Sequence, residues 1–143
     1  MRRALRLAAL IQAYGLLVLH SLLVVCIVRV ALSVTTYRKI AQWMPAIADR
    51  HVSETRVRHI LRAVVSVAKY VPKASCLTQA LSAQYLCGKA GYATSVMIGV
   101  AKNKVNDIEA HAWLARDGRV LIGGTLEEIG RYTPIADLTC KRA

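Results

Sequence analysis

Residues 92–122 read YATSVMIGVAKNKVNDIEAHAWLARDGRVLI. The stretch opens with a run up to Val100 that is rich in β-branched side chains and alternates between two faces, which predicts a strand. After a polar loop, Ala110–Ala115 predicts a second strand. The Asp-Gly pair at 117–118 is a signal for a two-residue hairpin turn, so Arg119–Ile122 is predicted to return as a third strand. The stretch therefore predicts a small antiparallel sheet.

Two helices are predicted directly before this sheet. Ser53 is placed as an N-cap residue, and Pro72 stops the helix that follows. Ser75 precedes a second run, Cys76–Lys89, and Gly91 can supply the left-handed residue that ends it. The first of these helices has an apolar stripe at 3.6-residue spacing, formed by Val57, Ile60, Leu61, Val64 and Ala68. The order of elements predicts an α+β fold in which a helical N-terminal region packs on the sheet.

The N-terminal segment is helical in pattern and unusually apolar. Leu7–Val28 contains no charged residue and is long enough to cross a bilayer. Polar and small residues interrupt it, however, at Gln12, Tyr14, Gly15, His20 and Ser21. We therefore expect a helix that is buried or faces a partner, with membrane association as the less favoured alternative. A short amphipathic helix is expected at Tyr37–Ala48.

Composition and charge exclude several classes of protein. The 143 residues fit one domain, and 55% of them are hydrophobic, which excludes an intrinsically disordered chain. The formal net charge is +12, and residues 1–62 contain only two of the eight acids. Basic chains attract nucleic acids, anionic membranes or acidic peptides. No stretch interleaves basic and aromatic residues, so a nucleic-acid partner is not expected.

The four cysteines favour reduced thiols over a disulfide framework or a metal site. None of them forms a Cys-x-x-Cys pair, and Cys76 and Cys87 lie three helical turns apart, so neither a metal nor another cofactor is predicted. The sequence shows no plausible signal peptide, which indicates a cytoplasmic protein, with peripheral attachment to a membrane as a further possibility.

Cys76 and His111 are the candidate catalytic residues. Cys76 opens a predicted helix, where backbone N–H groups and the helix dipole stabilise a thiolate and could also hold an oxyanion. His111 lies on a predicted strand. A cysteine on a helix opposite a histidine on a strand is the arrangement of a nucleophile with its general base. A buried structural role for each is the alternative, because lone cysteines and histidines are usually structural.

Four segments in this order resemble the transglutaminase-like core of lasso peptide biosynthesis B proteins of the split type. They read CLTQAL at 76–81, GYATSVMIGV at 91–100, EAHAWL at 109–114 and DGRVL at 117–121. The resemblance covers roughly residues 53–140, and the arginine-bearing helical region before them is also similar to that family. It implies a papain-like core at residues 53–143, preceded by an apolar, arginine-rich helical region at residues 1–52.

This resemblance implies a cysteine peptidase that removes the leader from a ribosomally made lasso precursor. Cys76 would be the nucleophile, and His111 the general base that then protonates the leaving amine. Trp113 shares the strand face of His111 and would either wall the site or belong to the core. The implied partners are a separate leader-binding protein, the precursor peptide and an ATP-dependent macrolactam cyclase that acts afterwards. The positive charge of the chain would steer an acidic leader or its carrier.

One position departs from the family pattern. An Asp often follows the catalytic His by about a dozen residues to orient the imidazole, and here that position is Gly123. Glu109 and Glu127 are weak substitutes, and Asp117 is expected to serve the turn. A backbone carbonyl that fixes the tautomer of the imidazole is another possibility. The missing carboxylate leaves open an alternative function, a catalytically silent scaffold subunit of the lasso maturation complex.

Overall fold

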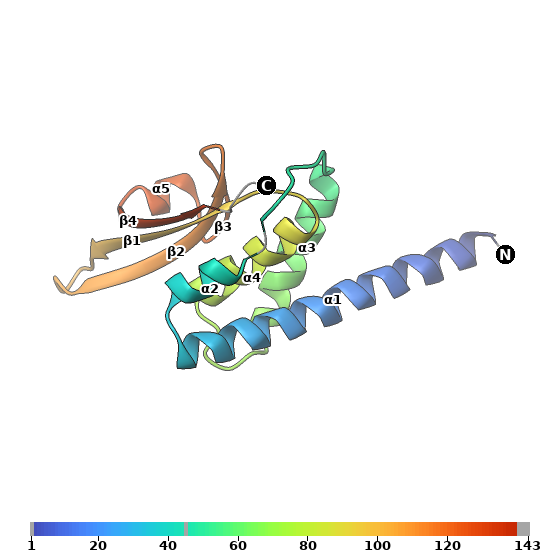
Figure 1. Ribbon diagram of the computed structural model, residues 1–143, viewed down its shortest axis with the longest axis horizontal. Coiled ribbons are helices and arrows are strands. Elements are labelled where there is room, and N and C mark those ends of the chain that lie inside the picture. The colour runs from blue at the N-terminus through green and yellow to red at the C-terminus, as the bar shows by residue number, and fades with distance from the viewer. Residues whose placement is uncertain (1, 45, 140–143) are drawn as a thin grey trace.

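The structure is a computed structural model that describes residues 2–44 and 46–139, with side chains described from residue 12 onward. Helices and one antiparallel sheet form the two parts of the α+β fold (Figure 1). The element order is α1 (Arg2–Val34), α2 (Tyr37–Trp43), α3 (Glu54–Ala68), α4 (Cys76–Lys89), β1 (Ser95–Lys102), β2 (Ile108–Arg116), β3 (Arg119–Ile122), α5 (Leu126–Ile129) and β4 (Thr133–Thr139).

The sheet has the strand order β3-β2-β1-β4, and all its described pairs are antiparallel. The hairpin between β2 and β3 turns at Asp117 and Gly118, which both have positive φ angles, as a type I′ turn requires. In the register of β1 and β2, Gly99 lies opposite His111. The three predicted strands are thus present, and the sheet is antiparallel as expected.

Helix α4 joins the helical part to the sheet. It packs on β1 and β2 from one side and on α1 and α3 from the other (Figure 1). Apolar side chains from every layer meet in one core, with Leu81 of α4, Val64 of α3, Val25 of α1 and both Val96 and Leu114 of the sheet fully buried. Because α1 shares this core, the helical region is packed onto the sheet through α4 rather than standing apart from it.

Two elements at the C-terminal end are absent from the prediction. Helix α5 lies on the face of the sheet away from α4, and β4 pairs with β1 as a fourth strand (Figure 1). The sequence of β4 contains a proline and has mostly exposed side chains, so it lacks the apolar alternation that identifies a strand. Helix α2 ends at Trp43 instead of Ala48, and this expected boundary was therefore wrong.

Arg116 of β2 connects the sheet to the segment between α2 and α3. Its guanidinium donates to both carboxylate oxygens of Asp49 at 3.2 Å and to the carbonyl of Ala93 at 3.2 Å, and it lies over the ring of Tyr92 at 4.1 Å. Burial acts to lower the pKa of Arg116, but the hydrogen bond and the charge of Asp49 outweigh this and raise it. The Arg116 guanidinium therefore stays a cation and ties β2 to the segment between α2 and α3.

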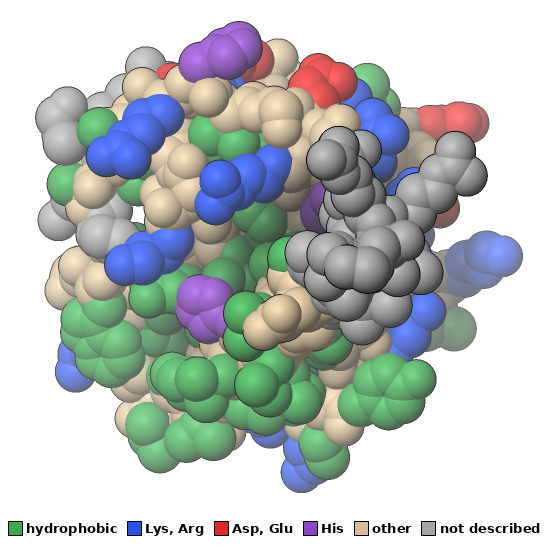
Figure 2. All heavy atoms as spheres, turned by 90° about the vertical axis from the view of Figure 1, so that its right-hand side faces the viewer, with side chains coloured by type: hydrophobic (Ala, Val, Ile, Leu, Met, Phe, Trp, Pro, Cys, Tyr) green, Lys and Arg blue, Asp and Glu red, His purple; other side chains and the backbone are tan. Residues whose placement is uncertain are grey.

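Helix α1 presents an apolar side that the rest of the chain leaves exposed. Gln12–Val34 is long and apolar enough to cross a membrane by length and composition alone, and only 22% of its most apolar part is buried. Figure 2 shows hydrophobic side chains gathered in the lower part of one face, at the height of α1 in Figure 1, with Lys and Arg side chains above them. Among the described side chains of α1, the large exposed hydrophobic ones are Tyr14, Leu16, Val18, Leu19, Leu23, Ile27, Val30 and Val34.

Candidate active site

Cys76 is the first residue of α4, and a capping box fixes that end of the helix. The Ser75 hydroxyl accepts from the Thr78 N–H at 3.3 Å, and the Thr78 hydroxyl accepts from the Ser75 N–H at 3.3 Å. Within the described residues, the N–H groups of Cys76 and Leu77 have no partner. Two open amide donors therefore accompany a half-buried thiol, which is the arrangement that stabilises negative charge at a helix N-terminus.

His111 of β2 is held by the main chain. Its Nε2 lies 2.5 Å from the carbonyl oxygen of Gly123, the residue 12 positions later in the sequence. A carbonyl oxygen only accepts, so the hydrogen of this bond belongs to Nε2. In the neutral imidazole Nδ1 then carries a lone pair and can act as a base. Gly123 is the position at which the resemblance implies an Asp. Its backbone carbonyl, rather than a carboxylate, binds the imidazole.

Cys76 and His111 line the same cleft, which has a volume of about 740 Å³. Helix α3 forms one wall, and the end of β3 with Gly123 and Gly124 forms another. The Gln79 side chain, one turn after Cys76, also lines it and brings a third possible donor. The two residues that the sequence singled out, 35 positions apart by their numbers, therefore reach one solvent-accessible space.

Two aromatic rings pack against the ring of His111. The ring centroid of Tyr132 lies 5.2 Å from that of His111, and the ring of Trp113 stacks at 6.2 Å. Trp113 is 5% exposed and does not line the cleft, so it belongs to the packing behind His111. The Tyr132 hydroxyl donates to Glu109 at 2.8 Å, and this bond, together with burial, raises the pKa of Tyr132.

A comparison with protein-family models shows the family of the chain that forms this cleft. Residues 21–137 match the model of the transglutaminase-like superfamily. The chain belongs to the transglutaminase-like superfamily. The match begins within α1, at Ser21, and covers nearly all of the sheet, and it agrees with the α+β, papain-like fold. No curated protein and no solved structure gave a match.

Membership of the transglutaminase-like superfamily fits a scaffold of the cysteine peptidase kind, and it agrees with acyl-transfer chemistry at a cysteine. The match supports the transglutaminase-like superfamily that the resemblance implies. The narrower identity, a lasso peptide biosynthesis B protein, remains a proposal. The boundary expected between residues 52 and 53 stays a prediction, and the family match extends across it.

The carboxylates considered from the sequence do not contact His111. Glu109 lies on the same strand, but it binds Arg131 at 2.6 Å and Tyr132. Asp117 lies at the hairpin turn and pairs with Arg116 at 3.4 Å, and Glu127 is exposed on α5.

Glu128 is an acid near His111 that the sequence reasoning missed. Hydrogen bonds from the Thr125 N–H and hydroxyl lower its pKa, and the nearby charges of Arg131 and His111 act in the same direction. A capping-box pattern, Thr-x-x-Glu at residues 125–128, could have signalled it.

The position of Gly123 cannot hold the expected aspartate with this backbone. Its φ is +107°, and an added Cβ would lie 2.7 Å from the Trp113 Cβ. Any side chain there would be strained and would displace Trp113 from behind His111. This chain therefore has a glycine at this position, and the carbonyl of that glycine accepts the imidazole hydrogen.

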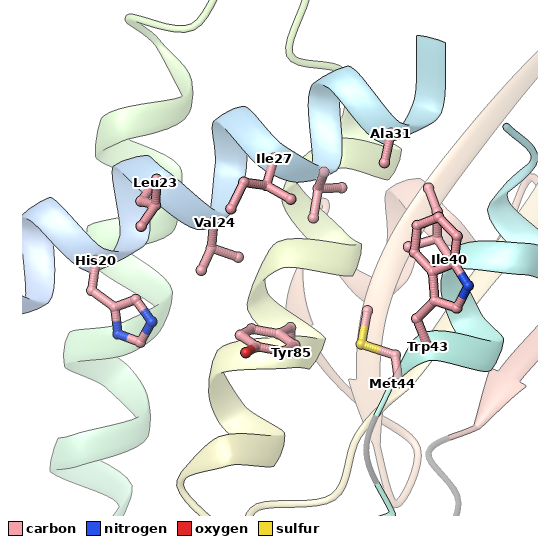
Figure 3. A pocket seen from close by; sticks show the side chains of 10 residues that line it. His20, Leu23, Val24, Ile27, Ala31, Ile40, Trp43, Met44 and Tyr85 are labelled. Atoms are coloured by element: carbon pink, nitrogen blue, oxygen red, sulfur yellow. The ribbon is translucent and has the colours of Figure 1, made fainter. Parts of the chain in front are cut away.

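A second cavity lies away from Cys76 and His111, between α1, α2 and α4 (Figure 3). Its lining is almost entirely apolar, with His20, Trp43 and Tyr85 as its larger side chains, and its volume is about 280 Å³. It contains no nucleophilic cysteine. Within residues 2–44 and 46–139, no group of three or more His, Cys, Asp or Glu side chains gathers that could hold a metal ion.

Proposed function

We propose that this protein is a cysteine peptidase that removes the leader from a ribosomally synthesised lasso precursor peptide. The observation that carries the proposal is the cleft shared by Cys76 and His111, with the imidazole bound through Nε2 to the Gly123 carbonyl. A thiol, a base with a defined tautomer and open amide donors are the groups that acyl transfer requires. The resemblance to lasso B proteins supplies the reaction and the substrate.

In the proposed reaction, Nδ1 of His111 takes the thiol proton of Cys76, and the sulfur attacks the carbonyl carbon of the scissile bond. The Cys76 and Leu77 N–H groups, together with the Gln79 amide, stabilise the oxyanion. The C–N bond then breaks, and the imidazolium gives its proton to the leaving amine. A water molecule that loses a proton to His111 attacks the thioester. The C–S bond breaks, which releases the leader with a new carboxyl end and restores the thiol.

The walls of the cleft suit an extended peptide. Strand β3 is the last in the strand order, so one of its backbone edges is not paired within the described sheet. Leu121, Ile122 and Gly123 at this edge line the cleft. An extended peptide can add to such an edge through main-chain hydrogen bonds. A chain segment bound there would run past both Cys76 and His111.

The proposal includes a separate leader-binding protein that delivers the precursor, and a macrolactam cyclase that acts on the product. The apolar side of α1 supports the need for a partner, because Leu19 is 63% exposed and Ile27 is 58% exposed. Exposed apolar patches of this kind mark interaction sites. We place the maturation complex in the cytoplasm, with contact between α1 and a membrane as the alternative use of this surface.

The test is a cleavage assay with the full chain, its leader-binding partner and the precursor peptide, followed by mass spectrometry. We expect cleavage at one site by the wild-type chain and a loss of at least about 1,000-fold in rate for Cys76→Ala and His111→Ala. Cys26→Ala and His59→Ala, which lie outside the cleft, are the matched controls and should keep the activity. Equal cleavage by all variants would contradict the proposal and assign the chain a scaffolding role.

A further inference from the structure

Two arginines on α3 lie in the wall of the cleft that faces the reactive groups. Arg58 and Arg62 are one helical turn apart, and both line the same cleft as Cys76 and His111. Side chains four residues apart project from one side of a helix. Both arginines are exposed, so their side chains are open to solvent in this wall of the cleft.

These two charges have no counter-ion in the described part of the chain. Neither arginine takes part in an ion pair or a side-chain hydrogen bond there, and no acidic residue lines the cleft. The nearest acid on α3 is Glu54, one turn before Arg58, and its carboxylate binds Arg119 at 3.3 Å. Two like charges at this spacing destabilise a helix slightly. The pair is thus a slightly unfavourable arrangement that a bound anion would relieve.

We propose that Arg58 and Arg62 bind a carboxylate side chain of the substrate, so that the enzyme selects peptides with Asp or Glu near the scissile bond. This inference rests on the proposed function, since it takes the occupant of the cleft to be a peptide. Guanidinium groups bind carboxylates through paired N–H donors, and such bonds are stronger than neutral ones. The selection acts inside the cleft and is distinct from attraction by the net charge of the whole chain.

The position of the pair also defines which substrate side chains it can reach. A peptide on the edge of β3 directs alternate side chains to opposite sides. Helix α3 forms the opposite wall of the cleft, through Leu61 and Val65 as well as the two arginines. An acidic side chain that points to α3 would meet the guanidinium groups, and its apolar neighbours would meet the rest of that wall.

The experiment measures binding rather than cleavage. The full chain with Cys76→Ala is titrated into fluorescent nine-residue peptides of Thr, Ala and Gly that carry one Asp at each successive position, and into the matched Asn peptides. We expect one or two Asp positions to bind about tenfold more tightly than their Asn counterparts. The double change Arg58→Gln and Arg62→Gln should remove this preference. Arg56→Gln, on the same helix but outside the cleft, should keep it.

Each outcome has one meaning. Equal affinity for the Asp and Asn series, including weak binding of both, overturns the inference, and so does a preference that survives the double change. Thermal unfolding of the double variant checks that the exposed substitutions leave the fold intact. The binding readout does not need the thiol. A preference for Asp, together with no cleavage of the precursor by the wild-type chain in the assay above, would therefore contradict the proposed function and leave the carboxylate site standing.

Discussion

At the scale of single residues, the orientation of His111 depends on a glycine. The Gly123 carbonyl receives the imidazole hydrogen, and the absent Cβ leaves room for Trp113 directly behind the ring. A main-chain acceptor cannot rotate away as a carboxylate side chain can. The imidazole is therefore held by the backbone and by ring packing together.

Replacing Gly123 with Ala tests this arrangement. The positive φ of +107° and a Cβ only 2.7 Å from the Trp113 Cβ should lower the free energy of unfolding by about 2–4 kcal/mol. Gly118→Ala is the control, because its φ is also positive but nothing lies within 4 Å, and we expect a loss of about 1 kcal/mol. Urea denaturation measures both. Equal losses would mean that Trp113 does not press on this position.

At the scale of elements, helix α4 is tied to the sheet by one buried side chain. The Gln84 amide nitrogen donates to the carbonyl of Thr94 at 3.2 Å and to the carbonyl of Leu138 at 2.5 Å. These bonds link the helix that carries Cys76 to the segment before β1 and to β4. Gln84 is 1% exposed, so the bonds form out of contact with water.

Gln84→Glu should destabilise the protein in a pH-dependent way. At pH 7 the change buries a carboxylate against two carbonyl oxygens, and we expect a loss of about 3–5 kcal/mol. Burial raises the pKa of such a group, so part of the stability should return at pH 4.5, where the protonated acid can donate again. Guanidinium denaturation at both pH values measures the difference.

Gln79→Glu on the same helix is the matched control for this prediction. Its side chain lines the open cleft and stays in contact with water, so the loss should remain within about 1 kcal/mol at both pH values. A loss for Gln84→Glu that does not change with pH would show that the buried amide does not make these bonds.

At the scale of the whole molecule, α1 has one side buried in the core and another side exposed to solvent. One side belongs to the shared core, where Val25 is 0% exposed, and the other faces outward, where Val30 is 63% exposed. The core side contacts α3 and α4, which carry the wall of the cleft and Cys76. The described part of α1 therefore supports the site without lining the cleft itself.

Two identical substitutions distinguish these two sides of α1. Val25→Ala should lower the free energy of unfolding by about 2 kcal/mol, because it leaves a cavity in the core. Val30→Ala should change it by no more than about 0.5 kcal/mol. Thermal and urea denaturation of the full chain provide the measurement. Small and equal effects would mean that α1 does not pack on α3 and α4.

The amino-acid sequence by itself determined the parts of this protein that depend on neighbours along the chain. The Ser53 and Ser75 caps and the turn at 117–118 appear where the sequence predicts them, because each involves contacts within four residues. The same local reasoning identified Cys76 at a helix start and His111 on a strand. It missed β4, whose pairing with β1 leaves no apolar alternation in its own residues.

The tertiary structure decided everything that joins distant segments. It brought Cys76 and His111 to one cleft, turned the Gly123 carbonyl onto the imidazole, and placed Arg58 and Arg62 in the opposite wall. It also decided which side of α1 is buried, since an apolar helix carries no mark of which neighbours will cover it. Such relations depend on how the helices and the sheet pack together, and short-range sequence patterns do not encode that packing.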